Sequence, residues 1–170
     1  KSLELRAIAL DALGTIKDPA TLPELVKLLD DPEDLVRKYV AFNAAAVAEK
    51  ADAESRGAAT EAIKKKLADP VADVTWNAAF ALAYFLNDRS GTDILMKMVD
   101  RKYLAEKIRR DDPNSEDLQA RVIIMACNAA VKLKDRGFIP HLQRLTDDQQ
   151  ERRSEVRFTA HQAISKLQEK

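Results

Sequence analysis

The stretch VRFTAHQAISKL at residues 156–167 repeats the pattern of LRAIALDALGTI at residues 5–16. Each begins with an aliphatic residue and an arginine, carries alanine four and seven positions after that aliphatic residue, and has further aliphatic residues at offsets eight and eleven. Apolar residues with these offsets line one face of an α-helix, whereas a strand would place them at every second position. The shared pattern therefore predicts a long amphipathic helix near each end of the chain.

The same pattern returns between these two copies. Residues 74–85, VTWNAAFALAYF, keep the apolar residues at the same offsets, and residues 36–47, VRKYVAFNAAAV, keep the Val-Arg start and the aliphatic end. A weaker copy lies around residues 120–133. An internal repeat of this kind is typical of proteins that stack one structural unit, so the period rather than any single motif decides the fold.

A turn and a shorter helix are predicted after each long helix. The segment LPELVKLLDD at 22–31 matches IPHLQRLTDD at 139–148, with a proline where the first helical turn tolerates the missing N–H. Thr21 and Glu24 have the spacing of a capping box. An aspartate marks the turn in four copies: Asp18, Asp52, Asp88 and Asp135. Two more aspartates, each before a proline, are predicted to cap long helices: Asp31 and Asp69.

Two of the copies carry insertions. Stacked helices cannot accept extra residues, so insertions in such proteins fall in the connections. We therefore expect a longer turn in EKADAESRGAA at 49–59 and an additional segment in RKYLAEKIRRDDPNS at 101–115. The second insertion is also rich in cations: Arg101, Lys102, Lys107, Arg109 and Arg110.

Composition supports helices and excludes several classes of protein. The chain has 170 residues, only 4 glycines and 5% aromatic residues, which favours an all-α fold. Its 28 basic and 28 acidic residues cancel, so there is no general attraction to nucleic acid or to anionic lipid. The single cysteine, Cys127, excludes an internal disulfide and is predicted to be a small buried apolar residue. No segment has the length of a membrane span. We expect a cytoplasmic protein and, because the chain begins at Lys1, a fragment or a processed product.

The long-helix pattern Val-Arg-x-x-Ala-x-x-Ala-Leu-x-x-Ile, the aspartate at the turn and the short helix that begins Leu/Ile-Pro-x-Leu resemble HEAT repeats. The resemblance is to the short bacterial HEAT-like type named after phycobilisome lyases, and it covers nearly the whole chain. It implies an armadillo-type fold, a right-handed α-solenoid of helical hairpins (an α-α superhelix) with about four repeats and a final helix. We expect one such domain over residues 1–170. Asn43 stands where the pattern has alanine.

No catalytic motif stands out. The sequence contains no glycine-rich phosphate loop, no nucleophile elbow and no His-Glu-x-x-His helix. His141 and His161 lack neighbours at metal-ligand spacing and are expected at the surface. The chain is therefore predicted to be no enzyme and to use no cofactor. The leading hypothesis is a scaffold that binds another protein on the concave surface formed, as the resemblance implies, by the second helix of each repeat.

Candidate contact residues have two interpretations each. Trp76, Phe80 and Tyr84 form an aromatic stripe that is either part of the core, the favoured interpretation, or a partner-binding surface. The arginines near the start of the long helices are expected to form ion pairs between repeats rather than an anion-binding row: Arg6, Arg37, Arg121 and Arg157. Several cations on or near the second helices could instead line a basic binding surface: Lys64, Lys65, Lys97, Arg101 and Arg144.

Alternative functions stay open. A bilin-lyase-like protein would need a pocket with convergent polar groups, a nucleic-acid-binding HEAT-like protein would need a continuous basic groove, and a segment of a longer solenoid would need neither. We expect another protein as the partner, and neither a membrane nor a nucleic acid. The two end helices also differ, because the last has one apolar face whereas the first carries apolar residues on more than one side: Leu3, Leu5, Ile8, Leu10, Leu13 and Ile16. We expect further sequence or a partner to cover the first helix.

Overall fold

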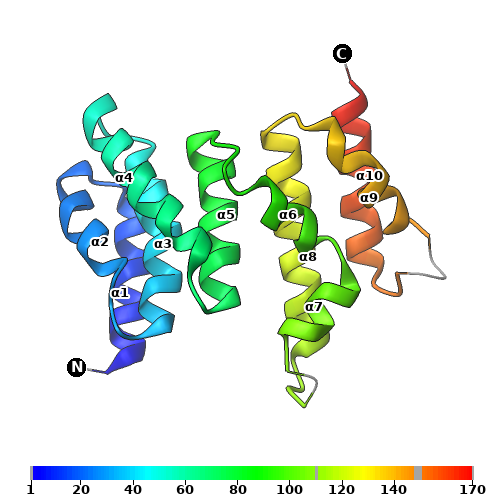
Figure 1. The fold of residues 1–170 in the computed structure, drawn as a ribbon, viewed down its shortest axis with the longest axis horizontal. Coiled ribbons are helices and arrows are strands. Elements are labelled where there is room, and N and C mark those ends of the chain that lie inside the picture. Colours follow the sequence, from blue (N-terminus) through cyan, green and yellow to red (C-terminus); the bar gives the residue numbers. More distant parts are fainter. Residues whose placement is uncertain (1, 110, 148–150, 170) are drawn as a thin grey trace. The chain divides into compact units, whose positions relative to one another are not determined.

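The computed structural model describes residues 2–109, 111–147 and 151–169 and is built from helices (Figure 1). Within those ranges the chain forms ten α-helices, three short 3-10 helices and no strand. Alanine, leucine, lysine and glutamate all lose little conformational freedom in a helix, which explains why the repeats take this form. The prediction of an all-α fold is confirmed.

Long and short helices alternate along the chain. The long helices are α1 (Leu3–Ile16), α3 (Asp34–Ala48), α5 (Ala72–Leu86), α8 (Ser115–Lys132) and α10 (Ser154–Gln168). The short partners of the first four are α2 (Leu22–Leu28), α4 (Ala53–Lys65), α6 (Thr92–Met98) and α9 (Ile139–Arg144). The described residues thus contain the four helical hairpins and the final long helix that the repeat pattern predicts.

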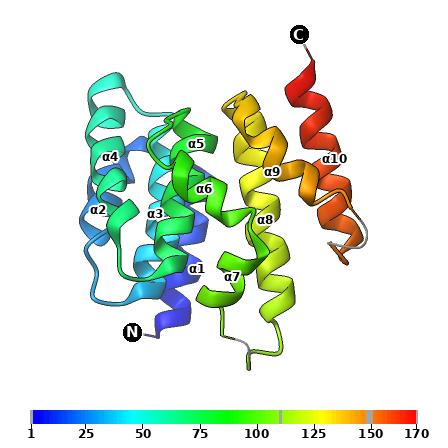
Figure 2. The ribbon, with the colours of Figure 1, turned by 45° about the vertical axis from the view of Figure 1, so that its right-hand side comes forward.

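Contacts group the chain into two compact units, one that ends at Gly91 and one that begins at Thr92. In the first unit α3 packs between α1 and α5, and α2 and α4 pack against α3 (Figure 2). In the second unit α8 packs against α6 and α10, and α9 packs against α10. The expectation of one domain over residues 1–170 stays a prediction.

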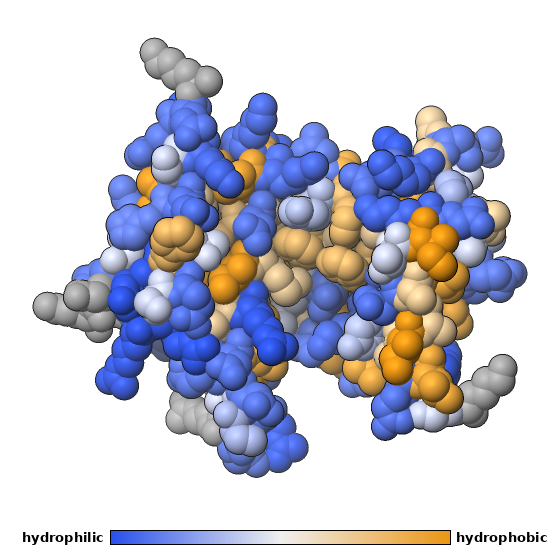
Figure 3. Space-filling view, turned by 180° about the vertical axis from the view of Figure 1, so that it is seen from behind, coloured by the Kyte–Doolittle hydropathy of each residue, from blue (hydrophilic) through white to orange (hydrophobic). Residues whose placement is uncertain are grey.

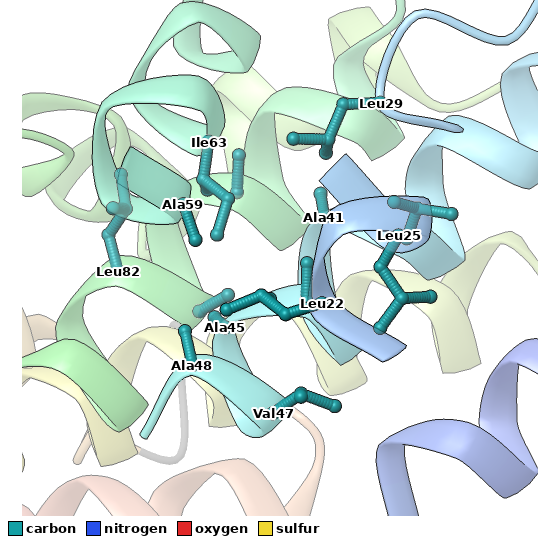
Figure 4. Close-up of a cluster of buried hydrophobic side chains, with 14 of the residues drawn as sticks. Leu22, Leu25, Leu29, Ala41, Ala45, Val47, Ala48, Ala59, Ile63 and Leu82 are labelled. Atoms are coloured by element: carbon teal, nitrogen blue, oxygen red, sulfur yellow. The ribbon is translucent and has the colours of Figure 1, made fainter. Parts of the chain in front are cut away.

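The core of the first unit is aliphatic and rich in alanine (Figure 4). Leucines of α2, alanines of α3 and the pair Ala59 and Ile63 of α4 point toward one another there. Small alanine side chains allow helix axes to approach closely, and burial of each large aliphatic side chain stabilises the fold by about 1.5 to 3 kcal/mol. The repeated alanines are therefore the residues that let successive hairpins stack.

The aspartates predicted at the turns accept hydrogen bonds from backbone N–H groups. In three turns the aspartate bonds the N–H two residues later at 2.8 to 3.0 Å: Asp18, Asp88 and Asp135. The residues before them adopt the left-handed conformation that ends a helix, with φ between 51° and 54°: Lys17, Asn87 and Lys134. In the second hairpin Asp52 accepts from the N–H of Ser55 at 2.9 Å and begins α4. The predicted turns are confirmed.

Two predictions about helix caps were wrong. Residues 19–21 form a 3-10 turn, so Thr21 is already helical and its hydroxyl donates to the carbonyl of Asp18 at 2.7 Å. Glu24 bonds Lys27 instead of closing a capping box. Asp31 and Asp69 do bond backbone N–H groups, but each lies two residues before the N-cap residue of its long helix, Glu33 or Val71, and bonds the N–H of that residue.

The two insertions fold differently from each other. The predicted longer turn at 49–59 is mostly helix, because α4 begins at Ala53 and runs for 13 residues. The insertion therefore lengthens the second helix rather than the connection. The other insertion forms a helix of its own, α7 (Arg101–Lys107), which packs on α6 and α8. Asp100 caps α7 by accepting from two backbone N–H groups, and Arg110 lies outside the described residues.

Candidate groove between the second helices

The two cations predicted on α4 have different surroundings. Lys64 Nζ lies 2.9 Å from Glu61 and 3.0 Å from Asp88, so it ties α4 to the turn after α5. Hydrogen bonds to Glu61 and Asp88 raise the pKa of Lys64. Lys65 is exposed and has no ionic partner among the described residues. Lys64 is therefore a structural residue, whereas Lys65 is open to solvent.

In the second unit, three of the predicted contact residues lie around one groove of about 520 Å³. Lys97 belongs to α6, Arg144 to α9, and Arg101 begins α7. The remaining lining residues are Asp93, Met96, Val99, Asp100, His141 and Leu145. The structure thus brings Lys97, Arg101 and Arg144 together, as the basic-surface interpretation expected. It places Lys64 and Lys65 on the first unit.

The charges in the groove are not equally available. Asp100 is engaged as the cap of α7, where it accepts from the N–H groups of Lys102 and Tyr103. Lys97 and Arg144 are exposed and have no ionic partner in the part of the chain that the structure describes. The floor between them is apolar, since Val99 and Leu145 are buried. Asp93, four residues before Lys97 on α6, is an exposed carboxylate in the same lining. The groove therefore offers two open cations and one open carboxylate beside an apolar floor.

Arg101 has a different role from the one predicted. Its Nε and Nη2 donate to the two carboxylate oxygens of Glu151 at 2.8 and 2.7 Å, and Glu151 is only 2% exposed. Nη1 also donates to Gln119 at 3.3 Å. The carboxylate of Glu151 further accepts from the N–H of Arg153 just before α10. A bidentate pair of this kind fixes orientation, so Arg101 holds α7 and the groove wall in place.

A comparison of the second helices explains why Lys97 and Arg144 are open. On α2 a glutamate three residues earlier bonds the cation, in the pair Glu24–Lys27 at 2.7 Å. On α4 the matching cation, two residues after the buried Ile63, is Lys65, which has Ala62 three residues earlier and is open as well. On α6 and α9 the residues three positions before the cation are Ile94 and His141. The residue three positions before each cation can be read from the sequence. The sequence analysis did not find this difference because it did not compare the second helices with one another.

Several groove residues were not foreseen. His141 was expected at the surface, whereas it is half-buried and lines the groove; His161 is exposed as expected. Glu151 lies fifty residues from Arg101 in the sequence, and no local pattern links the two. Among the described residues, no cluster of three or more His, Cys, Asp or Glu side chains is arranged to hold a metal ion.

The aromatic stripe belongs to the interior. Trp76 and Phe80 are buried, and only Tyr84 is exposed. Phe80 stacks on Phe42 of α3 with ring centroids 6.0 Å apart and on Tyr84 at 5.0 Å. Ring contacts of this kind add to the packing of α3 against α5. The structural interpretation of the stripe is favoured, and Trp76 and Phe80 are not surface contact residues.

The repeated arginines link hairpins. Arg37 donates from Nε and Nη2 to both carboxylate oxygens of Asp69, at 2.8 and 3.1 Å, and Arg6 donates from Nη2 to Oδ2 of Asp31. Arg157 donates to the carbonyl oxygen of Glu151 at 2.7 Å. Arg121 is exposed and has no ionic partner in the described ranges. Two of the four arginines, Arg6 and Arg37, therefore form the predicted ion pairs between repeats, whereas Arg157 bonds a carbonyl just before its own helix.

Cys127 lies in the interior of α8 and is fully buried. Burial raises the pKa of its thiol to about 12. Because the thiolate is the reactive form, this cysteine is inert in the native state. The prediction of a small buried apolar residue is confirmed.

Comparisons with known proteins add one finding about the family. The family model of the PBS lyase HEAT-like repeat matches residues 5–31, which span α1, α2 and the aspartates that follow. No curated protein matches the chain. No helix in the described part of the chain combines the length and the apolar composition that a membrane span requires.

Proposed function

We propose that this HEAT-like repeat protein works without catalysis, as a scaffold that binds an acidic segment of a partner protein in the groove between α6 and α9. The observation that carries the proposal is the loss of the neutralising glutamate on these two helices. Lys97 and Arg144 have no carboxylate three residues earlier, whereas the matching cation of α2, Lys27, bonds Glu24. The open cations would attract a carboxylate that the first hairpin already supplies internally.

The rigidity of the groove supports a binding role. Arg101 and Glu151 hold α7 against the segment before α10, and Asp100 fixes the first turn of α7. The side chains that shape the wall are therefore ordered before any partner arrives. A pre-formed site avoids part of the entropy cost that association otherwise carries.

The chemistry of the groove limits what the partner can present. Each exposed ion pair contributes about 0 to 1 kcal/mol, so Lys97 and Arg144 alone would give weak binding. An aliphatic side chain on the floor beside Val99 and Leu145 would add about 1.5 to 3 kcal/mol if fully buried. The best fit is a peptide with aspartate or glutamate on both sides of a leucine or similar residue.

The test is a binding titration with the full 170-residue chain and a fluorescein-labelled peptide in which glutamates flank a single leucine. Lys97→Glu combined with Arg144→Glu is expected to weaken binding at least about tenfold, and rising salt is expected to weaken the wild-type complex. The matched control is Lys102→Glu combined with Lys107→Glu. It changes the net charge equally, at two exposed residues of α7 that do not line the groove.

Three results would contradict the proposal. Equal loss of affinity in both double variants would mean that peptide binding depends on the net charge of the chain and not on the groove. Absence of binding by the wild-type chain would remove the acidic segment as the partner. Tighter binding of a short DNA duplex than of the peptide, at moderate salt, would favour the nucleic-acid alternative.

A further inference from the structure

The groove between α6 and α9 contains an acidic side chain that the fold leaves unused. Asp93 lies in the first turn of α6, is exposed, and forms no ion pair with any residue that the structure describes. Arg101 is not available to neutralise it, because its guanidinium is held by both carboxylate oxygens of Glu151. The other acidic residue of the lining, Asp100, is engaged as the cap of α7. Of these two carboxylates, Asp93 is the one open to a ligand.

A comparison with α4 explains why Asp93 is open. Glu61 has the matching position on α4, because each of the two acidic residues lies two residues before a fully buried aliphatic residue of its helix. Glu61 is neutralised within its own helix by Lys64, at 2.9 Å. On α6 the position that matches Lys64 is Met96, which lines the groove and carries no charge. The acidic residue is thus present on both helices, whereas the cation that pairs with it is present only on α4.

Asp93 and Lys97 present opposite charges to the groove from one side of α6. Residues four apart in a helix lie on the same face and are separated by about 6 Å along the axis. No ion pair joins these two side chains in the structure. A pair with this spacing is weak in water, so a ligand can compete for both charges. Two residues of an extended peptide span about 6 to 7 Å, which matches the separation of Asp93 and Lys97.

We propose that Asp93 is a specificity-determining residue that selects segments of mixed charge. The acidic segment bound in the groove carries a lysine or arginine about two residues beyond one of its glutamates, and this cation pairs with Asp93 while the glutamate meets Lys97. The inference rests on the proposed function, because it adds a requirement to the segment that the groove binds. Specificity is a difference between affinities. Asp93 contributes to it in two ways, since it attracts a cation and repels a carboxylate at the same point.

The test uses the full 170-residue chain and three unlabelled peptides that compete with the fluorescein-labelled acidic peptide. Each peptide has a glutamate on both sides of a leucine, and the three differ only at the residue two positions before the first glutamate, which is lysine, serine or glutamate. The wild type is expected to bind the lysine peptide about three- to fivefold more tightly than the serine peptide, as one exposed ion pair allows. It should bind the glutamate peptide most weakly of the three.

Two variants test whether Asp93 causes this order of affinities. Asp93→Asn is expected to bind the lysine and serine peptides equally, and Asp93→Lys is expected to invert the order, so that the glutamate peptide binds most tightly. The matched control is Glu106→Gln, which also removes one carboxylate, from an exposed residue of α7 that does not line the groove, and should keep the wild-type order. A purely structural role of Asp93 in the first turn of α6 would change the stability of the variants but not the order of the three peptides.

The outcomes separate this proposal from the proposed function. Equal affinity of the wild type for the three peptides would overturn the role of Asp93 and leave the groove as a site for acidic segments. The wild-type order in Asp93→Asn would overturn it as well, since another group would then recognise the lysine. Absence of binding by all three peptides would remove the proposed function and, together with it, the selection by Asp93.

Discussion

The helices α1 and α10 carry the same twelve-residue pattern in opposite environments. Leu5 is 64% exposed, whereas Val156, its counterpart, is fully buried. The alanines that follow differ in the same way, since Ala9 and Ala12 of α1 are exposed whereas Ala160 and Ala163 of α10 are buried. Because the pattern is shared, the difference comes from the position of the helix in the stack and not from its own residues.

This comparison gives the stack a direction. The residues at the positions of Leu5, Ala9 and Ala12 in each long helix form its signature face, and in the first unit this face of α3 points toward α1, because Asn43 lies against Gly14. The opposite side of α10 is mostly polar, with His161 and Ser165 exposed, whereas the signature face of α1 exposes apolar side chains (Figure 3).

The largest expected effect comes from placing a charge at the two equivalent positions. Val156→Asp buries a carboxylate without a partner and is expected to destabilise the second unit by at least about 4 kcal/mol. Leu5→Asp changes an exposed residue and is expected to shift the free energy of unfolding by less than about 0.5 kcal/mol. Urea unfolding followed by circular dichroism measures both.

A substitution on the inner side of α1 is expected to have an intermediate effect on the free energy of unfolding. A Cβ at Gly14 would lie 2.0 Å from Oδ1 of Asn43, so Gly14→Ala is expected to cost about 2 to 3 kcal/mol. Nδ2 of Asn43 is buried without a hydrogen-bond partner among the described residues. Asn43→Ala removes that group and is expected to be neutral or stabilising by about 1 kcal/mol.

A double-mutant cycle of Gly14→Ala and Asn43→Ala tests whether the clash with Asn43 causes the loss of stability. In the Asn43→Ala background, Gly14→Ala is expected to lose most of its cost, because the methyl group then fills space that the amide occupied. If the two substitutions were additive, the clash would not explain the effect of Gly14→Ala, and the close packing of α1 on α3 would have to be described differently.

A smaller effect is expected from the arginine links between hairpins. Burial acts to raise the pKa of Asp69, but hydrogen bonds from Arg37 and from the N–H of Val71 outweigh it and lower the pKa. A lowered native pKa stabilises the fold above the unfolded value, about 3.9, and this contribution disappears as pH falls through the native pKa. Asp69→Asn is thus expected to cost about 1 to 2 kcal/mol at pH 7 and much less in strong acid.

The measurement is urea unfolding of wild type and Asp69→Asn from neutral pH to below pH 3. The difference between the two curves should be constant near neutrality and shrink below about pH 4. A difference that persists in acid would show that the carboxylate charge is not what Arg37 recognises. Asp111→Asn, which breaks an exposed pair with Arg109, is the control and should change little at any pH.

Much of the fold followed from local sequence signals. The helices and the aspartate turns depend on spacing and on hydrogen bonds within a few residues, and both are visible in one repeat. The extent of α4 was missed because the insertion at 49–59 was expected to fall in a connection, whereas it continues the helix through Gly57, which is exposed. An isolated glycine costs a helix only about 1 kcal/mol, which Asp52 as N-cap helps to offset.

The groove was predicted only in part. Lys97 and Arg144 follow from the rule that second helices share one surface, but the engagement of Arg101 by Glu151 depends on chain segments fifty residues apart. The burial of Trp76 and Phe80 could not be decided from their spacing, because one helical stripe can face either a neighbouring helix or solvent. Only packing distinguishes the two.

One measurement tests the central claim, that the signature face is buried in the four later long helices and open on α1. A cysteine is placed in turn at the first signature position of each long helix, Leu5, Val36, Val74, Val122 and Val156, and its labelling by a thiol reagent is followed at low protein concentration. Leu5→Cys should react like a free thiol, and the other four should be protected by orders of magnitude, as we also expect of the buried Cys127. Protection of Leu5→Cys at the level of the others, or fast labelling at any of the other four, would contradict this account.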